Sequence, residues 1–96
     1  MTQARESNLY EALLALKNEK EARAFFKDLC TPQEISSLQE RWRICQLLSD
    51  GDLSYREISQ LTNASLTTIG RVSRFLKDED YGGYKTLLKR FKDQEK

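Results

Sequence analysis

Residues 54–77 read SYREISQLTNASLTTIGRVSRFLK. Ser54 and Glu57 are spaced as a capping box that starts a helix, and Ser65 is placed to start a second one. The polar turn between them contains Asn63, the residue of this segment best suited to a left-handed backbone. Two short helices joined by a tight turn predict a helix-turn-helix over residues 54–77.

The second of these helices has two different faces. Its apolar side chains recur at helical spacing and are expected to face inward: Leu66, Ile69, Val72, Phe75 and Leu76. Its other face is small, polar or basic and carries no acidic side chain: Thr67, Thr68, Gly70, Arg71 and Arg74. Such a face suits a DNA major groove, and Arg56 lies near the start of the preceding helix, where backbone N–H groups also favour phosphate. We therefore predict a DNA-binding face that includes Arg56, Thr67, Gly70, Arg71 and Arg74.

The net charge of +1, from 16 basic and 15 acidic side chains, hides an uneven distribution. Residues 54–77 carry four basic side chains and one acidic side chain, and three acidic residues follow directly. Because phosphate contacts need positive charge only on the docking face, the local excess favours DNA binding. Two alternatives stay open. Arg71 and Arg74 could be surface charges paired with Asp78 or elsewhere, and the basic cluster of residues 85–92 could be a solvated helix face or a DNA-contacting arm.

The rest of the chain is rich in helix formers, with one proline and four glycines among 96 residues. Apolar spacing and capping signals predict these further helical segments: residues 7–28 with a break at 17–21, residues 32–48 after a capping box at Thr31 and Glu34, and residues 84–92. The sequence thus predicts one all-α domain over residues 1–96, with the helix-turn-helix near its centre.

Several function classes are excluded by what the chain lacks. Histidine is absent and Cys30 and Cys45 form no CxxC pair, so we expect reduced thiols and no metal site. The longest apolar run, Ala12–Leu16, is too short to cross a bilayer, and no signal peptide opens the chain, so we expect a cytoplasmic protein without membrane contact. No nucleophile–base pair and no glycine-rich phosphate loop are present, which predicts that the protein is not an enzyme and has no cofactor.

The run from Leu29 to Lys77 resembles the core of the Trp repressor family, and it is particularly similar to the YerC/YecD subgroup. The motifs that carry the resemblance occur in order and at fixed spacing: TP-x-E at residues 31–34, R-x-R-I at 41–44, LL-x-x-G-x-x-S-x-RE-I at 47–58 and T-I-x-R at 68–71. The flanking segments agree in helical character more than in sequence.

This resemblance implies a Trp-repressor-like bundle of about six helices that forms an intertwined homodimer. The adjacent Phe25 and Phe26 fit that implication, because they give more apolar surface than one small core can cover. The resemblance also brings two DNA-reading heads whose half-sites lie one helical turn apart, roughly 34 Å, the spacing known for helix-turn-helix dimers such as the Trp repressor itself. Arg56 would match a DNA-contacting arginine, and Leu66, Thr67 and Gly70 would take base-facing positions.

The resemblance further implies a pocket in which the family holds L-tryptophan beside the second helix of the helix-turn-helix, here residues 66–77, which we call the reading helix. The residues that match or replace its lining are Thr31, Arg41, Thr68, Arg71, Val72 and Phe75. Val72 stands where the family has a glycine, and Phe75 stands where it has a serine that helps to hold the amino group. Because these changes add volume and remove a polar partner, we hypothesise that Phe75 partly fills the pocket. The reading helix would then be set without L-tryptophan, or by a different amino-acid effector.

The leading hypothesis is a sequence-specific, double-stranded-DNA-binding transcriptional regulator, expected to be a repressor, that acts as a homodimer. The alternative is a helical protein-interaction module that keeps the fold without binding an operator.

Overall fold

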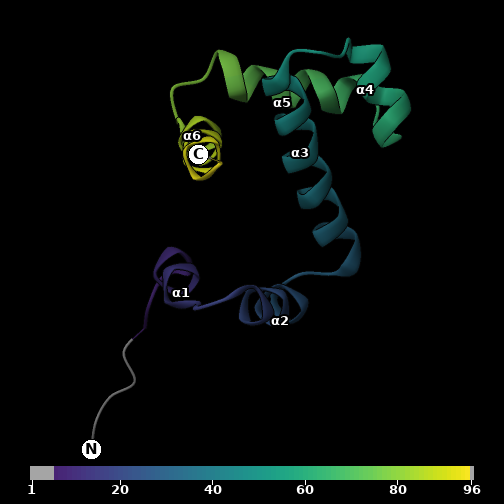
Figure 1. The fold of residues 1–96 in the computed structure, drawn as a ribbon. Coiled ribbons are helices and arrows are strands. Elements are labelled where there is room, and N and C mark those ends of the chain that lie inside the picture. Colours follow the sequence, from purple (N-terminus) through teal and green to yellow (C-terminus); the bar gives the residue numbers. More distant parts are fainter. Residues whose placement is uncertain (1–5, 96) are drawn as a thin grey trace, which may run out of the picture. The chain divides into compact units, whose positions relative to one another are not determined.

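The computed structural model describes residues 6–95, which contain six α-helices and no β-strand (Figure 1). The expectation of an all-α fold is therefore confirmed. The chain divides into two compact units, with the boundary between Ile35 and Ser36. The expectation of a single domain over residues 1–96 stays a prediction.

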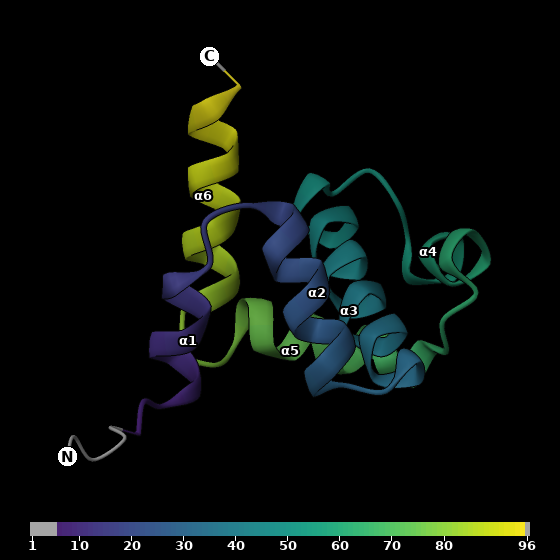
Figure 2. The same cartoon turned by 90° about the horizontal axis from the view of Figure 1, so that it is seen from below.

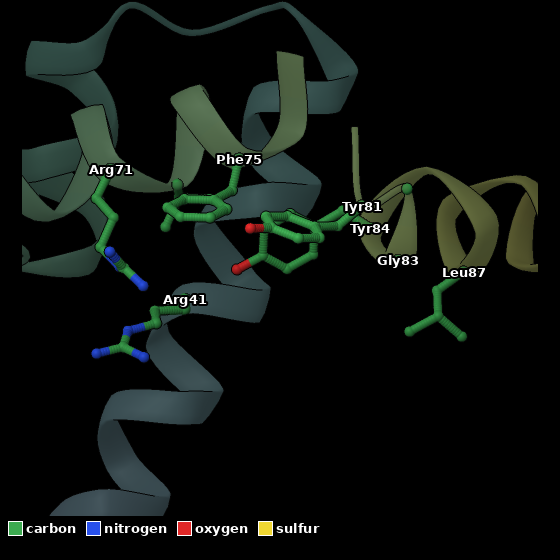
Figure 3. Close-up of a pocket in the computed structure, with 9 residues that line it drawn as sticks. Arg41, Arg71, Phe75, Tyr81, Gly83, Tyr84 and Leu87 are labelled. Carbon is green, nitrogen blue, oxygen red and sulfur yellow. The ribbon is translucent and has the colours of Figure 1, made fainter. Parts of the chain in front are cut away.

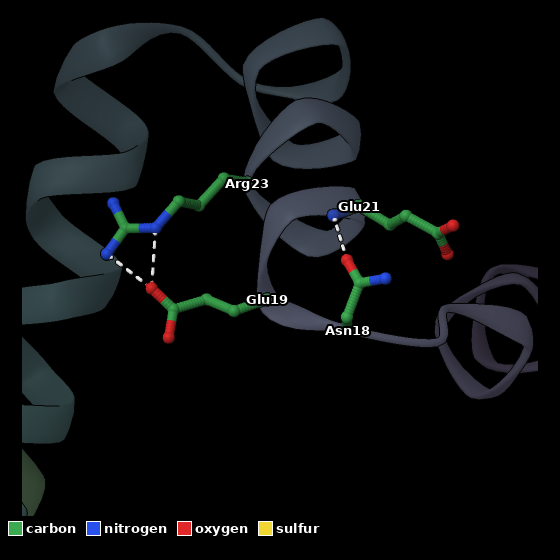
Figure 4. A network of polar contacts seen from close by, with 4 residues as sticks. All are labelled: Asn18, Glu19, Glu21 and Arg23. Carbon is green, nitrogen blue, oxygen red and sulfur yellow. Dashed lines mark hydrogen bonds and ion pairs between the residues drawn. The ribbon is translucent and has the colours of Figure 1, made fainter.

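The first unit contains α1 (Leu9–Ala15) and α2 (Glu19–Leu29). Asn18 caps the start of α2, because its side-chain oxygen accepts a hydrogen bond from the backbone N–H of Glu21 at 2.9 Å (Figure 4). Glu19 and Arg23 then form an ion pair of 2.7 Å along one face of the helix. The predicted break between two helical segments is present but shorter than expected, since the helix resumes at Glu19.

Helix α3 (Pro32–Asp50) starts at the predicted capping box, in which the Thr31 N–H donates to Glu34 and the Glu34 N–H donates to the Thr31 hydroxyl. It continues two residues past the predicted end, and Gly51 then adopts a left-handed backbone with φ of 77°. A helix can run to the residue before such a glycine, which explains the longer span.

The predicted helix-turn-helix consists of α4 (Tyr55–Thr62) and α5 (Leu66–Lys77). Ser54 and Glu57 form the capping box of α4, and Ser65 caps α5. Asn63 has φ of 62°, so the left-handed turn residue is also where the sequence predicts it.

Helix α6 (Gly83–Gln94) follows Gly82, whose φ of 75° turns the chain sharply after α5. It is longer at both ends than the predicted residues 84–92. Figures 1 and 2 show α6 crossing the C-terminal end of α5 at a steep angle. Trp42 of α3 contacts α6 through the rings of Tyr84 and Phe91, with ring centroids 6.3 and 6.1 Å apart.

The core of the second unit is built from three helices and the turn. Its buried apolar residues are Ile44, Cys45 and Leu48 of α3, Ile58 of α4, Ala64 of the turn, and Ile69, Val72 and Leu76 of α5. The predicted inward position of Leu66 is wrong, because this side chain is 57% exposed. Leu66 is the first residue of α5, and the buried stripe of that helix begins one turn later, at Ile69. Burial raises the pKa of Cys45 to about 11, and both cysteines are free thiols.

Candidate functional site

The two helices of the helix-turn-helix are held together by hydrogen bonds as well as by the core. The Tyr55 hydroxyl at the start of α4 donates to Ser73 Oγ on α5 at 2.5 Å, and Ser73 is only 6% exposed. The Ser59 hydroxyl donates to the carbonyl oxygen of Ala64 in the turn at 2.6 Å. The first bond joins α4 directly to α5 and the second joins α4 to the turn, so together they restrict the orientation of α5 relative to α4.

The predicted DNA-binding side chains lie on the solvent side of this unit. Arg56, Leu66, Thr67, Arg71 and Arg74 are exposed, and Gly70 is partly exposed. A Cβ placed on Gly70 would have no neighbour within 4 Å, so the interior of the protein does not require glycine there. The exposed position of Leu66 agrees with the base-facing role that the resemblance implies for it and not with a core role.

The two arginines of α5 have different partners within the chain. Arg71 lies over the ring of Phe75, with its guanidinium carbon 4.6 Å from the ring centroid. Arg74 pairs with Glu79, at 2.8 Å between Nη2 and Oε1. The alternative that Arg74 is a surface charge paired within the chain is thus confirmed, with Glu79 and not Asp78 as the partner. The N–H groups of Asp78 and Glu79 both donate to the Arg74 carbonyl oxygen, so the chain turns back and brings Glu79 beside Arg74.

A cavity of about 400 Å³ lies beside α5 (Figure 3). Its lining contains four of the six predicted pocket residues: Arg41, Arg71, Val72 and Phe75. In Figure 3 the guanidinium groups of Arg41 from α3 and Arg71 from α5 point toward the same space, beside the ring of Phe75. The pocket therefore offers two positive groups next to an aromatic surface.

The other two predicted pocket residues take part in capping the starts of helices, Thr31 as the capping residue and Thr68 as the residue that Ser65 caps. Thr68 is absent from the described lining; its N–H donates to Ser65 Oγ at 3.1 Å, and the two hydroxyl oxygens lie 3.0 Å apart. Thr31 belongs to the first unit, where it caps the start of α3 with Glu34.

Sequence reasoning missed the C-terminal side of the pocket, which comes from Tyr81, Gly82, Gly83, Tyr84 and Leu87. The signal that could have found it is the YGGY motif at residues 81–84, in which two aromatic residues flank a glycine pair. The ring of Tyr81 stacks on Phe75 with centroids 6.1 Å apart. Burial raises the pKa of Tyr84, and the nearby Cys45 raises it further.

Within the described part of the chain, no cluster of histidine, cysteine, aspartate or glutamate is suited to a metal ion. None of the described helices combines the length and the apolar character needed to span a membrane.

Comparison with known proteins matches residues 5–92 to the model of the Trp repressor protein family. The chain is 40% identical over 89 residues to the uncharacterized protein YerC of Bacillus subtilis (strain 168), covering 91% of this chain and 82% of YerC. It is 39% identical over 74 residues to a Trp operon repressor homolog of Aliivibrio salmonicida (strain LFI1238), covering 77% of this chain and 57% of that protein. The crystal structure of a TrpR-like protein from Eubacterium eligens ATCC 27750 superposes with a TM-score of 0.82 at 38% identity, covering 88% of this chain and 84% of that one.

Proposed function

The chain belongs to the Trp repressor family, and on that basis we propose that it is a DNA-binding transcriptional regulator rather than an enzyme. The observation that carries the proposal is the division of α5 into two faces. Ile69, Val72 and Leu76 are buried in the core, while the opposite face is exposed and has no acidic side chain. An exposed basic helix on a rigid support is the arrangement that inserts into a major groove.

Five of the predicted DNA-binding residues have assigned roles in the proposed complex. Arg56 and Arg71 would contact phosphates, because a guanidinium forms charge-assisted bonds with phosphate oxygens. Leu66, Thr67 and Gly70 would face base edges. Gly70 suits that role, since the space around it is open and the helix can approach the bases closely at this point. We expect the regulator to be a repressor.

We further propose that the regulator acts as a homodimer. Helices α1 and α2 bury none of their residues, and Leu14 of α1 is 87% exposed. Leu87 and Phe91 of α6 are exposed large apolar side chains as well. Exposed apolar helix faces of this extent are stabilised when a partner buries them, and a second copy of the chain is the simplest partner. Sedimentation equilibrium should give twice the mass of one chain, and a monomer would contradict this part of the proposal.

The lining of the pocket favours the proposal that the reading helix takes its DNA-binding orientation without bound L-tryptophan. The face of Phe75 already lies against the guanidinium of Arg71, where an aromatic ligand between the two arginines would be expected to stack. No carboxylate is found among the described lining residues that could hold the ammonium group of an amino acid. Calorimetric titration with L-tryptophan should give no saturable heat, and micromolar binding would contradict the proposal. A different effector in the same pocket stays open.

The salt dependence of binding tests the DNA-binding proposal against the protein-interaction alternative. The probe is a labelled duplex of about 30 base pairs, which spans two half-sites one helical turn apart. Binding should weaken steeply as salt rises, and Arg56→Ala should reduce the slope of log K against log salt by about one for each phosphate that Arg56 neutralises. Arg43→Ala is the matched control, because Arg43 is an exposed arginine of α3 outside the helix-turn-helix. Absence of duplex binding at low salt would favour the interaction module.

A further inference from the structure

The Arg74–Glu79 ion pair lies at the C-terminal end of the proposed reading helix. Both the Nε and the Nη2 of Arg74 donate to the same carboxylate oxygen of Glu79, at 3.1 and 2.8 Å. The pair therefore engages two of the donors that a guanidinium would otherwise present to a phosphate.

The main chain by itself brings Glu79 close to Arg74. Its N–H donates to the carbonyl oxygen of Arg74 at 3.1 Å, so the two residues are linked through the main chain as well. The Glu79 side chain is 30% exposed and that of Arg74 is 65% exposed. The Arg74 guanidinium also lies 5.6 Å from the ring centroid of Phe75. Because the backbone and the ring restrict both partners, less side-chain entropy is lost than in an ordinary surface pair.

We propose that Glu79 competes with the DNA backbone for Arg74 and so lowers the affinity of the reading helix for DNA. This inference rests on the proposed DNA-binding function. To contact a phosphate, the Arg74 guanidinium must leave the Glu79 carboxylate. The unpaired carboxylate then lies close to the negatively charged DNA backbone, which repels it. The Glu79 carboxylate occupies the Arg74 donors that a DNA phosphate would otherwise use. Its effect is therefore strongest on non-specific DNA binding, which depends on charge alone.

The experiment compares Glu79→Gln with Asp80→Asn, measuring affinity for a mixed-sequence duplex of about 30 base pairs over a range of salt concentrations. Each variant removes one negative charge from the same acidic run, but it is Glu79 that pairs with Arg74. Glu79→Gln should bind about twofold to fivefold more tightly than Asp80→Asn, the range expected for release of one exposed ion pair. The slope of log K against log salt should be steeper by about one for Glu79→Gln than for Asp80→Asn, because Arg74 becomes free to neutralise a phosphate.

The Arg74→Ala background shows whether Glu79 acts through Arg74. In that background Glu79→Gln and Asp80→Asn should have equal effects, since only the general loss of a negative charge remains. Equal affinities of the two variants in the wild-type background would overturn the inference. Weaker binding by Glu79→Gln than by Asp80→Asn would also overturn it, because Glu79 would then position Arg74 for DNA. If neither the wild-type protein nor any variant binds duplex at low salt, the proposed function itself fails.

Discussion

The guanidinium carbon of Arg71 lies 4.6 Å from the centroid of the Phe75 ring, one turn further along α5. Phe75 also stacks on Tyr81, so its ring connects the proposed DNA-binding face with the wall of the pocket (Figure 3). In the proposed mechanism, Phe75 holds Arg71 in the orientation that an aromatic effector would otherwise impose.

Phe75→Leu should weaken DNA binding while leaving the fold intact. Leucine keeps the position apolar, although it is smaller, but it has no aromatic face for Arg71. A cation–π contact at a partly exposed site contributes about 0.5–1 kcal/mol. We expect a loss of affinity of about twofold to fivefold, measured by fluorescence anisotropy, with less than about 1.5 kcal/mol lost in the free energy of unfolding. Unchanged affinity would show that Phe75 does not orient Arg71.

Combining Phe75→Ser with Val72→Gly should open the pocket to an amino acid. The pair removes volume beside Arg71 and supplies a hydroxyl that can accept a hydrogen bond from an ammonium group. Calorimetry with L-tryptophan should then give saturable heat that the wild-type protein lacks. Val72 is 1% exposed, so a stability loss of about 2–4 kcal/mol is expected, and circular dichroism must first show that the helices persist. A folded double variant without binding would remove the basis of the pocket argument.

Tyr55→Phe should loosen the contact between α4 and α5. It leaves the Ser73 hydroxyl buried without its described donor, which costs about 1–2 kcal/mol in the free energy of unfolding measured with urea. Adding Ser73→Ala should recover part of that loss, because removal of both partners is nearly neutral. Equal and additive losses from the two single variants would mean that the hydrogen bond contributes no coupling.

The capping box of α4 should make stability depend on pH in the acid range. The Ser54 backbone N–H, followed by its hydroxyl, holds the pKa of Glu57 below the usual 4.5. The folded state thus favours the carboxylate, so its stabilisation is present above the unfolded-state pKa and is lost as the pH falls through the lower folded-state pKa. Urea midpoints measured over this range should fall less steeply with acidification in Glu57→Gln than in the wild-type protein. Identical pH profiles would contradict the assigned role.

Local signals in the sequence predicted most of the helices. Caps and turns depend on neighbouring residues alone, and for this reason the starts of α3, α4 and α5 and the left-handed Asn63 were found correctly. Leu66 was misplaced because spacing identifies a helix face without showing where along the helix the core begins.

The sequence predicted the pocket and the ion pair only in part, because the pocket depends on tertiary geometry and the ion pair depends on how the backbone ends α5. Leu87 reaches the pocket because α6 crosses the end of α5, whereas Tyr81 reaches it from the segment between the two helices, where the YGGY motif is a local signal. Glu79 rather than Asp78 meets Arg74 because the backbone turns back at the helix end.

The proposed regulator reads DNA as a homodimer without L-tryptophan, and this is tested most directly by selecting bound duplexes from a random pool with and without L-tryptophan. We predict a two-fold-symmetric consensus with half-sites one helical turn apart, roughly 34 Å. It should be enriched equally in the selections with and without L-tryptophan. No enrichment at low salt, or enrichment only with L-tryptophan, would contradict the claim.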